Sequence, residues 1–151
     1  MAFDAFLKIE GIEGDSQQKG HAGEIEISSF SWGETNPGSV GKGTGAGTGK
    51  VQMQDFHFAM STSKASPTLM TSCASGKHFP TATLTCRKAG REQQLDFIVI
   101  KLSDVLISGY SIGGSTGDVD PEDQVSLAFV KIDYLFRETN DQGDILEFTG
   151  G

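Results

Sequence analysis

The stretch from Lys64 to Cys86 constrains the fold most, because it holds the one convincing helix pattern in a chain that otherwise alternates like strands. Ser66 is a suitable N-cap, Pro67 suits the first turn because its missing N–H costs nothing there, and Gly76 suits a left-handed end. A helix of about ten residues is marginal alone, so we expect it to pack on a sheet. The apolar stripe expected to face that sheet consists of Leu69, Met70, Cys73 and Ala74.

The rest of the chain reads as strands joined by turns. Residues 3–9 alternate between apolar and charged side chains, with Phe6 as the exception, and residues 81–87 alternate between threonine and apolar side chains. Two predicted strands, residues 94–102 and 125–137, are apolar on both faces, which is typical of central strands. A further strand is predicted at residues 103–112. The turn NDQG at 140–143 then leads to a last short strand. We predict a mainly β fold in a single domain, residues 1–151.

The strand EIEISSFSWG contains a change of phase. Isoleucines occupy odd positions before Ser28, whereas Phe30 and Trp32 occupy even positions after it, so the buried face changes at this point. A β-bulge produces such a change. We expect Phe30 and Trp32 to face the core, which leaves a small polar face formed by Ser29 and Ser31.

The segment from Gly33 to Lys50 contains seven glycines in eighteen residues and almost no large apolar side chain. It cannot hold a core of its own. Long loops in compact domains are usually functional or disordered, so this loop is a candidate contact arm.

Phosphate-binding motifs fail in this loop. Thr44 stands where a P-loop needs its first glycine, and Val51 stands where it needs Ser or Thr. Gly41, Gly43 and Ala46 fit the dinucleotide fingerprint loosely, but the loop leads into a strand rather than a helix, so no helix N-terminus would face a pyrophosphate.

Charge and targeting narrow the function classes. Asp and Glu (20) outnumber Lys and Arg (12), which gives a formal net charge of −8. Such a field repels nucleic acid and anionic membranes, so we expect neither nucleic-acid binding nor membrane insertion. The N-terminus lacks an apolar core of signal-peptide length, and we expect synthesis in the cytoplasm with any export by a signal-peptide-independent route. Cys73 and Cys86 lack metal-ligand spacing and are expected to be free, buried thiols.

Catalytic and metal motifs are weak. Asp118, Asp120, Glu122 and Asp123 resemble half of a calcium loop, but Pro121 interrupts them, and a solvated acidic loop is the preferred interpretation. The three histidines, His21, His57 and His78, are scattered, and His78 is expected to offset the dipole of the helix. No nucleophile-elbow pattern is present. We therefore predict no enzyme, no catalytic residue, no metal and no cofactor.

Six segments in fixed order carry a family resemblance: MAFDAFLKIEGIEGDS, EIEISSFSWG, GKVQMQDFHF, KASPTLMTSCASGKHFPTATLTCRKAG, KLSDVLISGYSIGGS and QVSLAFVKIDY. Together they resemble the haemolysin co-regulated protein (Hcp) family of type VI secretion systems, over nearly the whole chain. The resemblance implies a tail-tube-like fold, namely a distorted β-barrel of two sheets with one short α-helix.

The resemblance also implies hexameric rings that stack into a hollow tube. A contractile sheath would propel the tube, a spike (VgrG-like) protein would cap it, and effector proteins would bind in its lumen. Ser29 and Ser31 would face the lumen and its cargo. The glycine-rich arm would reach the neighbouring ring through Val40, Gly41, Lys42, Gly43, Thr44, Gly45 and Thr48. The alternative is a monomeric β-barrel that binds a small ligand in its interior.

Overall fold

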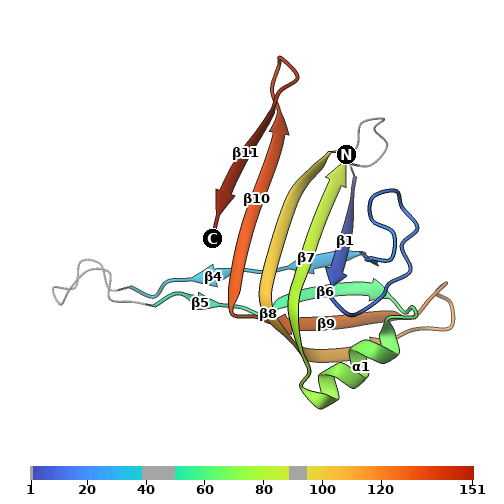
Figure 1. The fold of residues 1–151 in the computed structure, drawn as a ribbon. Helices are drawn as coiled ribbons and strands as arrows, with labels where there is room; N and C mark the ends of the chain where they lie inside the picture. Colours follow the sequence, from blue (N-terminus) through green and yellow to red (C-terminus); the bar gives the residue numbers. More distant parts are fainter. Residues whose placement is uncertain (1, 39–49, 89–94) are drawn as a thin grey trace.

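The computed structural model describes residues 2–38, 50–88 and 95–151. Within these ranges the chain forms eleven strands and one helix (Figure 1). The strands are β1 (Phe3–Ile9), β2 (Ile25–Ile27), β3 (Ser29–Ser31), β4 (Glu34–Thr35), β5 (Gln52–Met53), β6 (Phe56–Ser61), β7 (His78–Lys88), β8 (Asp96–Gly113), β9 (Glu122–Ala128), β10 (Lys131–Thr139) and β11 (Ile145–Gly150), and the helix is α1 (Ser66–Ser75). The mainly β fold with one short helix is thereby confirmed.

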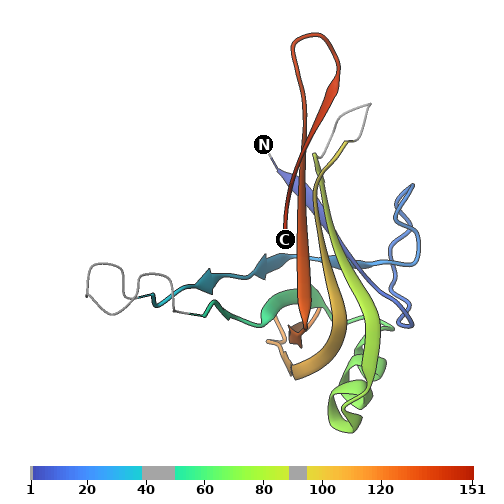
Figure 2. The ribbon, with the colours of Figure 1, turned by 60° about the vertical axis from the view of Figure 1, so that its left-hand side comes forward.

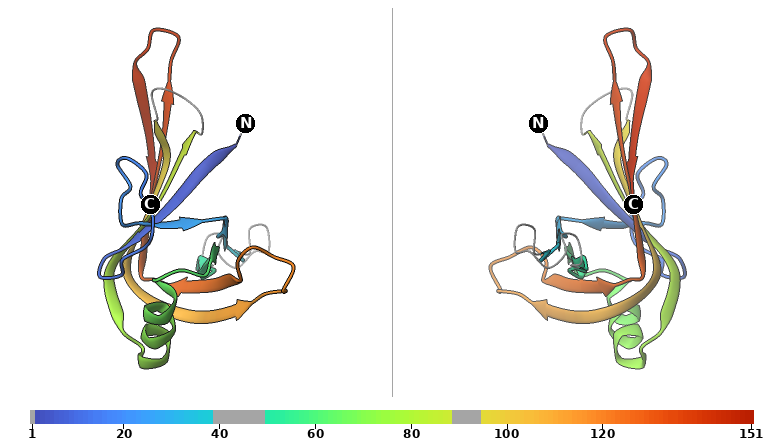
Figure 3. Two further views of the ribbon diagram at one scale, coloured as in Figure 1. Left: turned by 90° about the vertical axis from the view of Figure 1, so that its right-hand side faces the viewer. Right: turned by 90° about the vertical axis from the view of Figure 1, so that its left-hand side faces the viewer.

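Strand β8 organises the molecule because it belongs to two parts of one sheet. Its first half pairs with β7 on one side and β10 on the other, whereas its second half pairs with β9. We call β2-β1-β7-β8-β10-β11 the upper sheet, and the second half of β8 with β9-β6-β3 the lower sheet. Figures 1 and 3 show β8 bending from the upright strands into the lower ones.

The bend of β8 lies at Asp104, whose φ of 55° is in the left-handed region. Aspartate tolerates this conformation better than most residues. Two strands were predicted here, and that prediction was wrong because the polar pair Ser103 and Asp104 bends one continuous strand instead of ending it. His78 Nδ1 lies 3.2 Å from Asp104 Oδ1, so His78 pairs with this carboxylate at the start of β7. Its expected interaction with the helix dipole stays a prediction.

The opposite strand breaks at the same level. Residues 125–137 were predicted as one strand, but the chain leaves the ladder at Phe129 and Val130, between β9 and β10. The Val130 amide donates to the Ser103 carbonyl at 3.0 Å, so the break is anchored to the bend of β8. The prediction failed because the alternation of side chains does not reveal where a strand changes its partner. Before the break β9 pairs with β6, and after it β10 pairs with β11.

The predicted change of buried face at Ser28 is confirmed, but the predicted β-bulge was wrong: the chain passes here from one strand to another with a different partner, and so joins the two sheets. Strand β2 pairs with β1, β3 pairs with β6, and Ser28 between them donates its amide and its hydroxyl to the Ala59 carbonyl at 2.8 and 3.1 Å. The strand order therefore begins and ends on consecutive chain segments. The sheets are connected there through the backbone of the chain and are not closed by a continuous ladder.

The core lies between the two sheets. It is built from inward residues of nearly every strand, including Leu7, Ile25, Phe56, Met60, Leu84, Leu102, Ile107 and Leu127, each at most 2% exposed. Phe6, the exception to the alternation of β1, is also fully buried. It stacks on His21 at 4.4 Å between ring centroids, and Arg87 lies 5.0 Å from its ring. The connection between β1 and β2 thus covers the outer face of the upper sheet.

The helix ends as predicted but begins differently. Gly76 has φ 67°, and Pro67 lies in the first turn. The N-cap is Ala65, without a side-chain cap, because the Ser66 hydroxyl donates to Asp123 instead. The expected apolar stripe was wrong: Met70 is 53% exposed and Ala74 is exposed, and the buried helix residues are Ser66, Leu69 and Ser72.

Asp123 explains that helix face. It is fully buried and accepts hydrogen bonds from the hydroxyls of Thr62, at 2.8 Å, and Ser66. Asp118, Asp120 and Glu122 are exposed as expected of an acidic loop, but Asp123 lies in β9 and is not solvated. Burial and, secondly, the neighbouring Asp123 carboxylate raise the pKa of the Tyr110 hydroxyl. This carboxylate therefore ties the helix to the lower sheet.

We predict that Asp123→Asn lowers the free energy of unfolding by about 1.5–3 kcal/mol, because it removes a buried charged acceptor from two hydroxyl donors. Urea denaturation followed by circular dichroism measures the change. Asp120→Asn, the same substitution at an exposed position, is the control and should change stability by less than about 0.5 kcal/mol. Equal stability of the two variants would contradict the assigned role of Asp123.

Candidate functional site

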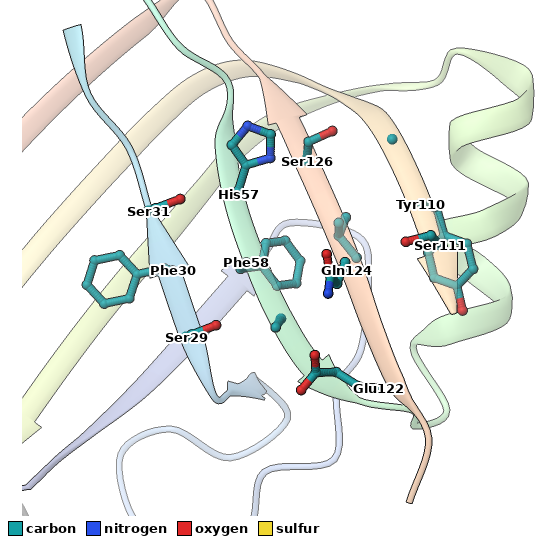
Figure 4. Close-up of a pocket in the computed structure, with 13 residues that line it drawn as sticks. Ser29, Phe30, Ser31, His57, Phe58, Tyr110, Ser111, Glu122, Gln124 and Ser126 are labelled. Carbon is teal, nitrogen blue, oxygen red and sulfur yellow. The ribbon is translucent and has the colours of Figure 1, made fainter. Parts of the chain in front are cut away.

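The exposed face of the lower sheet forms a hollow of about 610 Å³ (Figure 4). It crosses four strands in register. Ser31 on β3 lies opposite His57 on β6, which lies opposite Ser126 on β9, which lies opposite Gly109 on β8. The next row in the same direction consists of Ser29, Ala59, Gln124 and Ser111. The lining is therefore dominated by small and polar side chains.

The opposite face of these strands is apolar. Phe30, Phe58 and Val125 alternate with the polar rows, and Phe30 packs on Phe56 with ring centroids 6.0 Å apart. Ser29 and Ser31 are exposed and line the hollow. Trp32 is only half-buried, 6.3 Å from the Phe129 ring centroid, and its buried Nε1 has no hydrogen-bond partner within the described ranges.

A hydroxyl chain crosses one end of this face. The Ser108 hydroxyl donates to Asp55 Oδ2 at 2.7 Å and lies 2.9 Å from the Ser126 hydroxyl. Gly109 leaves room beside it, because a Cβ there would lie 2.6 Å from Ser126 Oγ and would displace this hydroxyl. The ladder is also irregular between Ile107 and Gly109, which brings these hydroxyls together.

This arrangement suits binding better than acid–base chemistry. The described part of the chain gives no hydrogen bond from His57 to a serine, so it shows no nucleophile and base in contact. His21 is buried, with Nδ1 3.1 Å from the Glu24 carboxylate and Nε2 3.2 Å from Asp96, and it holds the β1–β2 connection in place. Among the described residues, no three His, Cys, Asp or Glu side chains are grouped to hold a metal ion.

The two thiols are free, as predicted. Cys86 is fully buried, and burial raises the pKa of its thiol to about 11, whereas Cys73 is half-buried.

In the ranges that the structure describes, no helix has the length and apolar character needed to cross a membrane.

The base of the predicted arm is a short hairpin, in which β4 pairs with β5 through Glu34 and Met53. It points away from both sheets (Figure 2). Val51 and Met53 are 50% and 42% exposed because this hairpin has no sheet beneath it. The predicted stacking residues Val40, Gly41, Lys42, Gly43, Thr44, Gly45 and Thr48 lie outside the described residues.

A second surface was not located from sequence. Phe3, Phe97, Phe136 and Phe148 form a continuous row across the upper sheet, with successive ring centroids 6.1, 6.5 and 6.4 Å apart. We call these four residues the aromatic row. Phe148 is 52% exposed and Phe3 is 48% exposed. Phe3 and Phe136 lie on the same face as the core residues Ala5 and Cys86, so the row continues the core face to its exposed end. The available indication was the long apolar strands, whose apolar side chains exceed what one small core covers.

The orientation of β3 can be tested through stability. Ser31→Arg should change the free energy of unfolding by no more than about 0.5 kcal/mol, because its side chain enters the open hollow. Trp32→Ala should cost about 2–3 kcal/mol, below the 3–5 kcal/mol of a fully buried aromatic residue. Urea unfolding measures the free energy of unfolding of both variants and so tests the orientation of β3. A destabilised Ser31→Arg beside an unaffected Trp32→Ala would invert the assignment of the two faces.

Comparison with known proteins agrees with this fold. Residues 6–136 match the family described as type VI secretion system effector, Hcp. Protein hcp1 of Pseudomonas aeruginosa is 46% identical over 136 residues, which cover 89% of this chain and 84% of that protein.

Two solved structures are similar over almost their full lengths. The crystal structure of Hcp1 from Salmonella typhimurium has a TM-score of 0.79 at 33% identity, with 99% of this chain and 94% of that chain covered. A type six secretion system protein has a TM-score of 0.88 at 26% identity, with coverage of 99% and 93%. The chain belongs to the Hcp family of type VI secretion proteins.

Proposed function

We propose that this chain is the structural subunit of a type VI secretion inner tube, in which six copies form a ring and rings stack. The observation that carries the proposal is the pair of free edges on the lower sheet. Within the described residues, β3 pairs with β6 alone, and β7 accompanies β8 only as far as Leu106, which leaves one edge of residues 107–113 unpaired.

Free strand edges favour association with another chain. The two edges lie on different strands, β3 and β8, so an edge-to-edge contact between copies would join unlike surfaces. Contacts of this head-to-tail kind generate a ring when the rotation closes. Six copies would then place six lower sheets around one channel, with Ser29 and Ser31 on its wall.

The aromatic row supports the same assembly. Four phenylalanines on one face of the upper sheet, two of them about half exposed, are an unusually large apolar surface for an isolated subunit. A neighbouring copy would remove them from water at about 25 cal/mol per Å² of apolar surface.

The alternative, a monomeric barrel with a small ligand inside, has little support. Fully buried side chains, including Phe56, Leu84, Leu102 and Leu127, occupy the centre of the space between the sheets. The hollow described above lies on the exposed face of the lower sheet and suits a large guest better than an enclosed ligand.

Membership of the Hcp family supports a proposal for the partners of the tube. We propose that the contractile sheath surrounds the tube, that the spike protein sits at its tip and that effector proteins travel in the lumen. The tube itself would leave the cytoplasm by this route without a signal peptide. The role proposed is structural and involves no cofactor.

Native mass spectrometry at micromolar protein should show a closed species of six times 16.1 kDa. Phe148→Ser should shift the population toward smaller species, because it removes part of the apolar contact. Val119→Ser is the matched control, since Val119 is 97% exposed on a loop outside the proposed contact. A monomer that persists across protein and salt concentrations would contradict ring formation.

The arm provides a separate test. If it joins rings and not subunits within a ring, deletion of residues 40–48 should leave the hexamer intact and abolish tubes and secretion. Shortening this loop should change the free energy of unfolding only slightly, because the cost of loop closure varies slowly with loop length. Electron microscopy, native mass and a secretion assay are the measurements. Loss of the hexamer, or normal secretion, would assign the arm to another role.

A further inference from the structure

We infer that the hollow of the lower sheet selects cationic guests, namely proteins that present lysine and arginine side chains to the wall. The inference rests on the proposed function, because it concerns what the channel of the assembled ring would hold. It follows from the distribution of charge over the four strands that form the hollow.

The lower sheet carries no cation. Neither Lys nor Arg occurs in β3, β6, β9 or residues 107–113 of β8. Among the cations that the structure describes, Arg87 is buried beside Phe6, Lys88 lies over Phe97, and Arg137 pairs with Glu147. The four strand segments of the hollow therefore present no lysine or arginine of their own to a guest.

Carboxylates lie at both ends of the same face. Glu122 begins β9 and lines the hollow, and Asp118 joins it in an adjoining hollow of about 450 Å³. Asp55 lies at the opposite end, because it precedes β6 and β6 runs antiparallel to β9. Its carboxylate is held by the Ser108 hydroxyl at 2.7 Å, which fixes it on this wall.

Between these carboxylates the wall offers neutral hydrogen-bonding groups. The hydroxyls of Ser29, Ser31, Ser111 and Ser126 and the amide of Gln124 line the hollow together (Figure 4). His57 lies in the middle of this face, on the same side of the sheet as the serines. Apart from the carboxylates, it is the one ionisable lining residue on that side. Lysine and arginine supply only donors, so the carboxylates and hydroxyl oxygens can accept from them.

Six-fold repetition strengthens the selection. Three carboxylates in each subunit become eighteen in a ring, around one channel with low-dielectric walls. Clefts lined by one sign of charge concentrate ligands of the opposite sign. The same field repels an acidic guest, so it also discriminates between guests of different charge.

The test uses the full-length hexamer, first verified by native mass spectrometry, and fluorescein-labelled decalysine and decaglutamate as probes. Anisotropy titrations at 50 mM NaCl should show binding of decalysine and none of decaglutamate. The double variant Asp118→Asn/Glu122→Gln should weaken decalysine binding at least about fivefold, since local electrostatic concentration is of order 10 to 10³. The difference should shrink at 500 mM NaCl, where exposed charges are screened.

The matched control is Glu10→Gln/Asp141→Asn, which removes the same net charge at two exposed positions outside the hollow. It should weaken binding by less than about twofold. Equal losses in both double variants, no loss in either, or tighter binding of decaglutamate would overturn the inference while leaving the ring intact. A wild-type chain that is not hexameric would overturn the proposed function and this inference together.

Discussion

The continuous backbone of β8 is the constraint on which the rest of the structure depends. Eighteen residues run through both sheets, and the left-handed conformation of Asp104 allows the change of direction without ending the strand. The facing chain breaks at the same level, between Ala128 and Lys131, and the Val130 amide is bound to Ser103. The part of β8 before the bend is therefore followed in the sheet by β10 and β11, and the part after the bend by β9, β6 and β3.

This geometry separates stability from assembly. The interior between the sheets is filled by apolar side chains, and Asp123 fixes the helix to the lower sheet through two hydroxyls. The outer face and free edges of the lower sheet contribute little to that core. They are therefore available for the proposed contacts between copies and with guests, as the proposed role of a tube subunit requires.

Local patterns predicted the parts of the fold that local physics determines. Gly76 ended the helix as expected, and the change of buried face was placed correctly at Ser28, although it marks a change of partner strand and not the predicted bulge. The buried face of the helix was missed because it depends on Asp123, which is 57 residues from Ser66 in the chain. Periodicity placed Ser29 and Ser31 on a polar face, but it could not locate the aromatic row, whose members come from four strands.

The central claim is that the lower sheet, with its two free edges, forms the wall of a channel between copies. A cryo-electron microscopy reconstruction of the assembled protein tests it most directly. The account predicts that β3 of one copy lies beside residues 107–113 of the next, with Ser29 and Ser31 facing the channel. A ring in which these serines face outward, or in which the two edges remain apart, would contradict it.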